Sequence, residues 1–311
     1  MISSHTWSAV RVVTAGSALT FLLVYLQRYA PLAAFLVPFP CICASLFAGG
    51  RAGYLIVPVS LAALSLLGPH EVMLYLLQAV SISLLVPELI LRGKGWGNSI
   101  LSAVAVNTVL LSLFFLAYAV TVNGNVDAQM RDAIHAATGR IEEVYKTAGI
   151  TGGDLRELVT SLRQAEEILS RVYPALIAIF LWIGAACNLF LAGRLLRRFG
   201  RDIPWETFSL FRNPDHLVWI LIASGFALLA DHPHISQIAL NLLIAIMFLY
   251  FIQGMAVLIY FYRKYSLSFL ILLVGVVLIL AQPMMVAPIS AIGLIDLWAE
   301  FRTPKKQQTC G

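Results

Sequence analysis

Two turns of the sequence bring together residue types that could bind a metal ion. Imidazole and carboxylate groups are the ligands that zinc and other divalent ions commonly take from a protein. The residues are His70 and Glu71 in the first turn and Asp231, His232 and His234 in the second. Histidines beside a proline are also ordinary solvated turn residues, so the sequence predicts a metal site only if the two turns converge.

The motifs of the common catalytic sites are missing from the sequence. It contains no HExxH, GxSxG, GxxxxGK[ST] or GxGxxG pattern, and we therefore expect neither an enzyme nor a bound cofactor. Because there is no phosphate-binding loop, any ATP-driven role would need a separate ATPase subunit. The net charge is +5, but the basic residues fall in short connections between apolar segments, so nucleic acid is not an expected partner.

Several amide side chains lie within long apolar stretches, where polar groups are costly and mark either a helix contact or a site. They are Gln78, Asn107, Asn188, Asn241, Gln253 and Gln282. Hydrogen bonding between helices and contact with a ligand are both open interpretations for these amides. Glu88 precedes Arg92 by four residues, a spacing that predicts an ion pair on one helix face.

Membrane helices must position these side chains. Of 311 residues, 60% are hydrophobic and 12% are charged, whereas a soluble domain has about 25% charged residues. Apolar runs long enough to cross a bilayer recur along the chain. The sequence therefore predicts an all-α polytopic helical membrane bundle of nine or ten membrane segments with an extracytoplasmic helical hairpin. The segments are expected at residues 9–27, 31–49, 53–68, 71–91, 98–121, 171–194, 216–231, 235–262 and 267–288, with a tenth after a break near Pro283 and Pro288.

The basic residues indicate the orientation, because short cytoplasmic loops gather Lys and Arg. With the N-terminus in the cytoplasm, the short loops on the opposite side hold only Arg28. We therefore expect a multi-pass protein of the bacterial cytoplasmic (inner) membrane with its N-terminus in the cytoplasm. The cytoplasmic residues Arg194, Arg197, Arg198 and Arg201 are interpreted as topology anchors or as contacts to anionic lipid or a partner.

One long polar stretch, at about residues 122–170, interrupts the apolar segments. Apolar residues recur at spacings of three and four on both sides of Gly152 and Gly153, which predicts two amphipathic helices. Asp154, followed by Glu157, predicts the N-cap of the second helix. The predicted parts are an N-terminal five-helix membrane half (1–121), the hairpin (122–170), a C-terminal membrane half (171–301) and a polar cytoplasmic tail (302–311).

Prolines in the stretch APLAAFLVPFP interrupt the start of the second segment. Such a break frees backbone carbonyl groups at membrane depth and is tolerated only where protein or a cavity faces them. We therefore predict a ligand pocket formed by Pro38, Pro40, Asn107 and Asn241. The small residues Ala44, Ala48, Gly49 and Gly53 form a candidate helix-packing or partner face.

The sequence resembles two known families of membrane proteins. Residues 10–120, which include SLFAGGRAGYLIVPVSLAALSLLG, resemble the substrate-binding subunits of energy-coupling-factor transporters. That resemblance implies an extracytoplasmic ligand pocket and a face that docks a membrane coupling subunit, although the hairpin and the helices from the seventh onward lie outside that six-helix plan. Nearly the whole chain resembles the YybS-like family of uncharacterised bacterial polytopic membrane proteins. The residues that carry it are FSLFRNPDHLVW, Asn241-Leu-Leu, Gln253-Gly254-Met-Ala-Val and Gly293-Leu-Ile-Asp296-Leu-Trp298 with Arg302.

Gln253, Gly254 and Asp296 are accordingly family-signature positions whose role the resemblance leaves open. We expect a solute-binding or transport-related membrane protein, similar to the transporter subunits. The alternative is a non-transporting membrane scaffold or an assembly or regulatory factor that docks partners through residues 122–170. The lipid bilayer is the expected partner, and the candidates beyond it are a membrane coupling subunit with its ATPase and a second copy of the chain.

Overall fold

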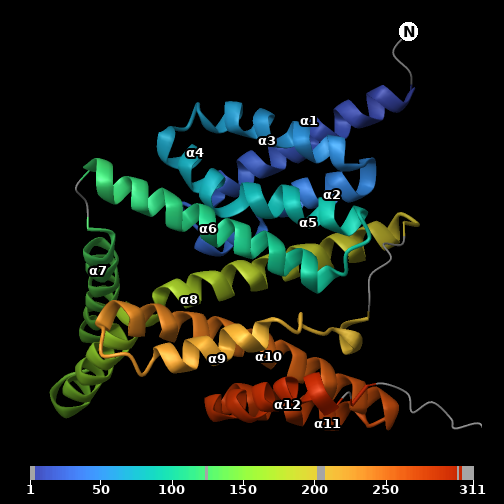
Figure 1. Ribbon diagram of the computed structural model, residues 1–311. Helices are drawn as coiled ribbons and strands as arrows, with labels where there is room; N and C mark the ends of the chain where they lie inside the picture. The colour runs from blue at the N-terminus through green and yellow to red at the C-terminus, as the bar shows by residue number, and fades with distance from the viewer. Residues whose placement is uncertain (1–3, 123–124, 202–206, 300, 303–311) are drawn as a thin grey trace, which may run out of the picture. The chain divides into compact units, whose positions relative to one another are not determined.

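The computed structural model describes residues 4–122, 125–201, 207–299 and 301–302, and every regular element within these ranges is helical (Figure 1). The α-helices are α1 (Ser4–Leu26), α2 (Phe39–Ala48), α3 (Gly50–Leu64), α4 (Pro69–Tyr75), α5 (Ser81–Leu91), α6 (Trp96–Val122), α7 (Val126–Thr147), α8 (Gly152–Arg198), α9 (Leu217–Ala227), α10 (Pro233–Lys264), α11 (Phe269–Ala281) and α12 (Val286–Ala299). Short 3-10 helices are η1 (Pro31–Leu36), η3 (Phe208–Leu210) and η4 (Pro283–Met285), and η2 (Leu76–Val80) is a π-helical turn. The predicted all-α fold is confirmed.

Five helical stretches in the described part of the chain are long and apolar enough to cross a membrane. They are Pro31–Ala48, Pro69–Leu91, Trp96–Thr121, Gly152–Arg198 and Pro233–Lys264. Shorter apolar helices lie at Val10–Leu26, Gly50–Leu64, Leu217–Ala227, Phe269–Ile279 and Val286–Ala299. Together they correspond to the ten predicted segments, and the predicted break near Pro283 is present as η4 between α11 and α12.

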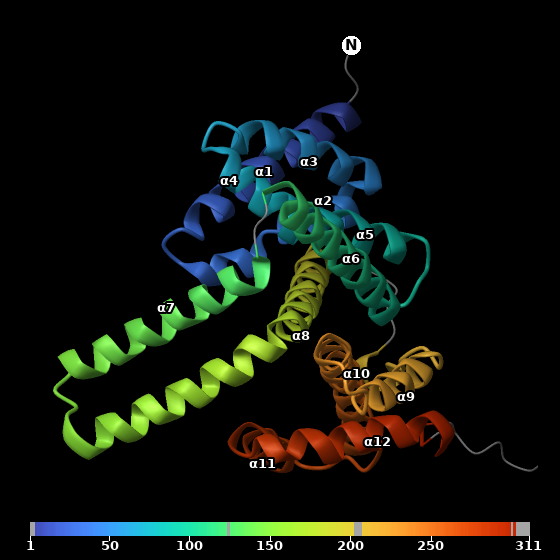
Figure 2. The same ribbon diagram turned by 60° about the vertical axis from the view of Figure 1, so that its left-hand side comes forward.

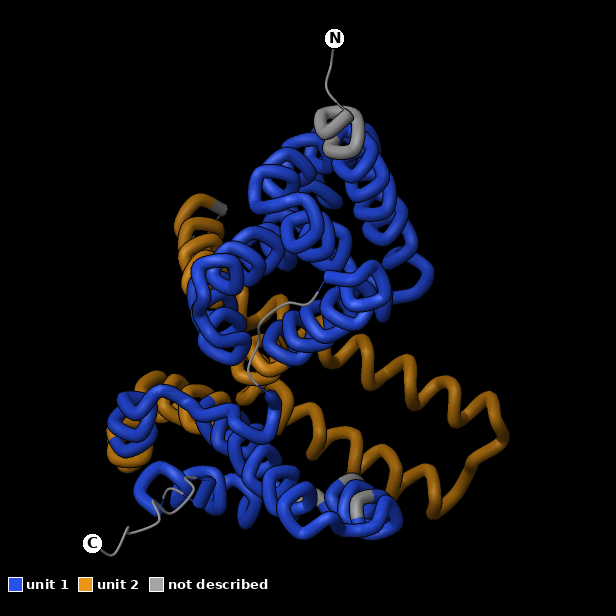
Figure 3. Tube along the Cα trace, turned by 90° about the vertical axis from the view of Figure 1, so that its right-hand side faces the viewer, with its two compact units in different colours: residues 1–107, 180–222, 246–311 blue, residues 108–179, 223–245 orange. Residues whose placement is uncertain are grey.

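The chain separates into two compact units (Figure 3). Unit 1 consists of residues 1–107, 180–222 and 246–311, and unit 2 of residues 108–179 and 223–245. The predicted polar stretch belongs to unit 2. The predicted tail lies outside the described residues apart from Arg302.

Unit 1 has an apolar core in its N-terminal half and an aromatic cluster around Trp96. The core residues are Val24, Val37, Cys41, Ala44, Ala52, Ile56, Val57, Leu64, Tyr75 and Ala79. Trp96 is fully buried and contacts the rings of Trp182, Phe190, Phe208 and Phe211. On α5, Glu88 Oε1 lies 2.8 Å from Arg92, which confirms the predicted ion pair.

Unit 2 contains the predicted hairpin, in which α7 and the N-terminal part of α8 run side by side (Figure 2). The two helices are joined through Glu166, which accepts hydrogen bonds from the Thr138 hydroxyl at 3.2 Å and contacts His135 Nδ1 at 3.1 Å. The apolar stripes of the hairpin pack on each other only in part, since the side chains of Ile141 and Val144 stay exposed.

One feature of α8 was not predicted from the sequence, and one prediction about it was wrong. The second amphipathic helix and the sixth membrane segment are one continuous helix, because a change from polar to apolar composition does not interrupt backbone hydrogen bonding. Asp154 is not an N-cap, since the helix already begins at Gly152 and Asp154 lies in its first turn. A carboxylate at that position still favours the helix through the positive end of the helix dipole.

Candidate functional site

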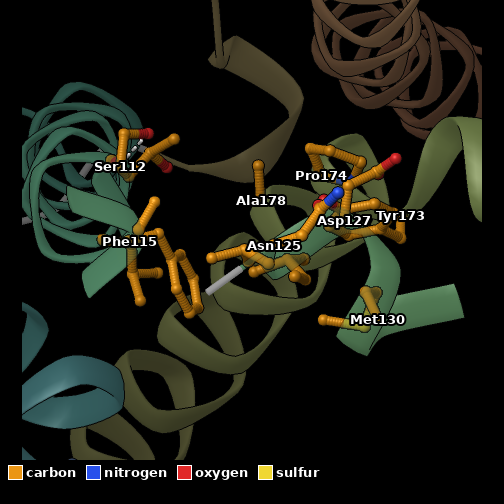
Figure 4. Close-up of a pocket in the computed structure, with 13 residues that line it drawn as sticks. Ser112, Phe115, Asn125, Asp127, Met130, Tyr173, Pro174 and Ala178 are labelled. Carbon is orange, nitrogen blue, oxygen red and sulfur yellow. Dashed lines mark hydrogen bonds between the residues drawn. The ribbon is translucent and has the colours of Figure 1, made fainter. Parts of the chain in front are cut away.

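A cavity of about 690 Å³ lies within unit 2, between the C-terminal part of α6, the start of α7 and the middle of α8 (Figure 4). We call this cavity the hairpin pocket. Its lining residues are Thr108, Leu111, Ser112, Phe115, Ala119, Asn125, Val126, Asp127, Met130, Tyr173, Pro174, Ile177 and Ala178. Most of these side chains are apolar, as in sites that hold small organic molecules.

Three polar side chains of the hairpin pocket, Asn125, Asp127 and Tyr173, lie close together, and Ser112 lies apart from them on α6 (Figure 4). The Tyr173 hydroxyl donates to Asp127 Oδ1 over 3.5 Å, a long hydrogen bond. Arg131, one turn further along α7, donates from Nε to Asp127 Oδ2 at 3.1 Å. The carboxylate in the pocket lining is therefore already neutralised by a guanidinium group.

The start of α7 is held in place by two side-chain hydrogen bonds. Asn125 is the N-cap, and its Oδ1 accepts the backbone N–H of Ala128 at 3.1 Å. Gln129 Nε2 donates to the Tyr118 hydroxyl at 3.2 Å and so joins α7 to α6. These bonds position Asn125 and Asp127 against the wall that α6 provides.

The residues predicted to form a ligand pocket lie elsewhere, and none of them lines the hairpin pocket. Pro38 is the N-cap of α2, and Pro40 is buried in the first turn. The predicted interruption of the second segment is present between η1 and α2, and one carbonyl group beside it has a side-chain partner. Asn188 Nδ2 on α8 donates to the Phe35 carbonyl oxygen, just before the break.

Asn107 and Asn241 are buried and also bond to backbone groups of neighbouring helices. Asn107 Nδ2 donates to the Leu77 carbonyl at 3.0 Å and contacts the Ser81 hydroxyl, both at the π-helical turn η2. Asn241 bonds to the backbone of α8 on either side of Pro174. Of the two interpretations that the sequence leaves open for the buried amides, helix contact describes these residues and Asn188.

The candidate packing face joins helices of the same chain. A Cβ atom added at Gly53 would lie 1.9 Å from Ser45 Oγ, so α2 and α3 touch at this point, and Ala44 is buried beside it. Gly49 connects the two helices with a positive φ of 95°, and Ala48 is exposed. The small residues at positions 44 and 53 therefore serve internal packing.

The candidate metal residues are divided between the units, with His70 and Glu71 in unit 1 and Asp231, His232 and His234 in unit 2. Glu71 is buried in an ion pair with Arg28, which uses its carboxylate. His232 and His234 lie with their ring centroids 5.7 Å apart. Within the ranges that the structure describes, no three His, Cys, Asp or Glu side chains form a group that could hold a metal ion.

The family-signature residues do come together, in unit 1. Gln253 on α10 donates from Nε2 to Asp296 Oδ2 on α12 at 3.1 Å and accepts the backbone N–H of Asn213 at 3.0 Å. Arg302 donates to both Asp296 carboxylate oxygens and to the carbonyls of two residues that precede α9, Ser209 and Phe211. We call Asn213, Gln253, Asp296 and Arg302 the Asp296 cluster.

Two glycines allow the helices of the Asp296 cluster to approach. A Cβ atom added at Gly254 would lie 2.0 Å from the Ile289 carbonyl oxygen, and one added at Gly293 would lie 2.0 Å from the Tyr250 carbonyl oxygen. The backbones of α10 and α12 are therefore in direct contact. Asp296 is 2% exposed and Gln253 is fully buried, so these two side chains are enclosed by the packed helices.

Three polar residues of the hairpin pocket, Asn125, Asp127 and Tyr173, were not predicted from the sequence. Asn125 and Asp127 belong to the cap and the first turn of α7, whereas Tyr173 lies on α8, and no sequence spacing links the two helices at this point. One signal was available, because Pro174 stands in an apolar helix directly after an amphipathic stretch, and a proline inside a helix marks an irregular turn.

Comparison with known proteins places the chain in a family. Residues 18–297 match the family described as predicted membrane protein (DUF2232), so the chain belongs to this family of membrane proteins. Over 299 residues the chain is 22% identical to the "Uncharacterized protein YybS" of Bacillus subtilis (strain 168), which covers 95% of this chain and 96% of that protein. The predicted YybS-like resemblance is confirmed. No solved structure matches the chain, and the resemblance to transporter subunits stays a prediction.

Proposed function

We propose that this membrane protein binds an uncharged amphipathic small molecule in the hairpin pocket, as the solute-binding step of a transport-related function. The observation that carries the proposal is the cavity itself, which is apolar over most of its wall and has a polar group formed by Asn125, Asp127 and Tyr173. Its volume of about 690 Å³ falls within the range of sites that hold small organic molecules.

The pairing of charges in the pocket favours an uncharged ligand. Among the described residues that line the pocket, Asp127 is the one charged side chain, and Arg131 already pairs with it. A cationic head group would have to displace that guanidinium, and an anionic head group would face the carboxylate. A hydroxyl or amide head group can instead bond to Asn125 and Tyr173, while its apolar part contacts Phe115 and Ile177.

The proposed orientation of the protein determines the side of the membrane on which the pocket lies. With the N-terminus in the cytoplasm, the end of α6 and the whole of α7 face the extracytoplasmic space, so a ligand would enter from outside the cell. A single cysteine placed at Gly149 in a cysteine-free background tests this orientation. It should react with a membrane-impermeant maleimide in intact cells, and reaction only after lysis would reverse the proposed orientation.

Photolabelling tests the pocket. The probe is a medium-chain fatty alcohol that carries a diazirine, applied to the purified protein in detergent, and labelled peptides are identified by mass spectrometry. Labelling should fall on the lining segments of α6 and α8. Ala178→Trp fills the pocket and should abolish this labelling, whereas Ala165→Trp places the same side chain at an exposed position on the same helix and should leave it unchanged.

Competition distinguishes the ligand classes. An unlabelled alcohol of the same chain length should reduce the labelling more than the matching carboxylate or trimethylammonium compound. Equal labelling in the parent protein and in Ala178→Trp would reject the pocket as a binding site. Stronger competition by either charged compound would reject the uncharged head group.

The exposed apolar side chains of the hairpin support the alternative function, a non-transporting membrane scaffold. Val144 on α7 is 66% exposed and Ile168 on α8 is 61% exposed, so the hairpin offers apolar side chains to a partner. The Ala178→Trp variant discriminates between the two functions when the phenotype of a chromosomal deletion is known, because it fills the pocket and leaves the hairpin in place. The deletion phenotype in an Ala178→Trp strain would favour ligand binding, and wild-type behaviour would favour the scaffold.

A further inference from the structure

The wall of the hairpin pocket on α8 contains a proline. Pro174 has no backbone N–H and cannot bond to the carbonyl of Ser170, and its ring pushes that carbonyl away. In a regular helix the next hydrogen bond of the ladder would join the N–H of Ala175 to the carbonyl of Arg171. The turn at Pro174 is therefore the weakest point of the backbone in this wall.

A side chain from α10 bridges that turn. The N–H of Ala175 donates to Asn241 Oδ1 at 2.9 Å, and Asn241 Nδ2 donates to the Arg171 carbonyl at 2.8 Å. The amide thus connects the same two backbone groups that a regular turn would join directly. Asn241 Nδ2 also donates to the Gln237 carbonyl on its own helix at 2.8 Å, which fixes the orientation of the amide.

The bridge between Ala175 and Arg171 requires a side-chain amide. One group must accept from a backbone N–H while another donates to a backbone carbonyl, and a carboxylate has no donor. Asn241 and Ala175 are both buried, so water cannot easily replace either bond. The bridge is therefore expected to be specific to the residue at this position.

The bridged turn carries part of the pocket wall. Tyr173 and Pro174 lie between the two bridged residues, and Ile177 and Ala178 follow on the next turn. We infer that Asn241 is a positioning residue of the hairpin pocket, which holds the Pro174 turn of α8 open in the geometry that admits a ligand. The bridging of the Pro174 turn rests on the hydrogen bonds of Asn241. The effect of Asn241 on ligand binding rests on the proposed function.

A double-mutant cycle tests whether Asn241 stabilises the Pro174 turn. The variants are Asn241→Leu, Pro174→Ala and their combination in the full-length protein, and the measurement is thermal unfolding in detergent. Asn241→Leu should lower the midpoint markedly in the parent protein. In the Pro174→Ala background the helix can form its own bonds at residues 174 and 175, so the same substitution should cost much less.

Two further variants keep the cycle interpretable. Asn188→Leu is the matched control, because its amide also bonds to a backbone carbonyl, at Phe35 in unit 1, and its effect should be the same in the parent protein and in the Pro174→Ala background. If Asn241→Leu does not fold, Asn241→Asp keeps the acceptor for Ala175 and loses the donor to Arg171. Equal costs of the Asn241 substitution in both backgrounds would overturn the inference.

Photolabelling with the diazirine alcohol tests whether Asn241 affects ligand binding in the hairpin pocket. Asn241→Leu and Pro174→Ala should each lose labelling of α6 and α8, because the first releases the turn and the second closes it, while folded Asn188→Leu keeps the labelling. Full labelling of folded Asn241→Leu would overturn the positioning role. Absence of labelling in the parent protein would reject the proposed function, whereas the thermal cycle would still decide whether Asn241 bridges the Pro174 turn.

Discussion

The Asp296 cluster in unit 1 and the hairpin pocket in unit 2 use the same residue types with opposite results. Each contains an aspartate paired with an arginine and at least one asparagine close by. In the cluster, Asp296 and Arg302 have side chains only 2% and 8% exposed. At the pocket, the side chains of Asp127 and Arg131 are 42% and 54% exposed, and Asp127 lines the cavity.

The difference teaches that polar residues in a membrane protein have to be judged by what surrounds them. A buried ion pair is a strong constraint on the fold, because removal of one partner leaves the other charge without compensation. An ion pair at the edge of a cavity contributes little to stability and leaves neighbouring groups accessible to a ligand. Substitutions in the cluster should therefore change stability, and substitutions in the pocket should change binding.

The largest effect is expected for Asp296→Asn. The substitution leaves the Arg302 guanidinium buried without its carboxylate and should reduce the free energy of unfolding by about 3 to 5 kcal/mol. Thermal unfolding in detergent is the measurement. The matched control, Asp127→Asn, disrupts the exposed pair and should cost no more than about 1 kcal/mol. Similar costs for the two substitutions would contradict the distinction between cluster and pocket.

A smaller loss is expected where α10 and α12 touch. Gly293→Ala places a Cβ atom against the Tyr250 carbonyl, and because backbone atoms cannot move aside locally, the helices must separate at a cost of about 1 to 3 kcal/mol. Gly275→Ala on α11 meets no atom within 4 Å and should be neutral or slightly stabilising. If both variants unfold at the same temperature, the contact between α10 and α12 is not tight.

Asn188→Leu extends the comparison to the break at Pro38. Loss of the amide leaves the Phe35 carbonyl without this donor and should cost about 1 to 3 kcal/mol. Photolabelling of the hairpin pocket should not change, because both bonded groups belong to unit 1. A labelling defect in the folded variant would show that the Pro38 break contributes to the ligand site after all.

The smallest effect concerns the hairpin and depends on pH. The hydrogen bond from Lys146 lowers the pKa of Glu142 below its ordinary value of 4.5, with help from the charge of Arg163. Because the pKa is lowered in the folded protein, the pair stabilises the hairpin above the ordinary pKa and loses this contribution as the pH falls through the lowered value. Glu142→Gln should therefore lower the thermal midpoint slightly at pH 7 and not at all in strong acid. A difference that persists in acid would assign the effect to packing.

Much of the fold follows from local patterns. Apolar length predicts the membrane segments, prolines predict the interruptions at Pro38 and Pro283, and a four-residue spacing predicts the Glu88–Arg92 pair. Each of these depends on residues close together in the chain. The continuity of α8 was not predicted, because the composition of the chain changes from polar to apolar within it while the helix continues.

The candidate site could not be predicted in the same way. Beside the break at Pro38, the Phe35 carbonyl accepts a hydrogen bond from Asn188, more than 150 residues away, whereas the turn at Pro174 borders a cavity that no sequence spacing indicates. A proline shows where a helix is weakened. It does not show whether a neighbouring side chain or open space lies against the weakened turn.

The sequence alone therefore determined the class of protein, the membrane segments and the polar residues available to the fold, because hydropathy and helix geometry act over short stretches of chain. The tertiary structure decided which of those residues became internal supports and which faced a cavity. That decision depends on packing between segments that are distant in sequence, and packing sets both the burial of a charge and the partner of every amide.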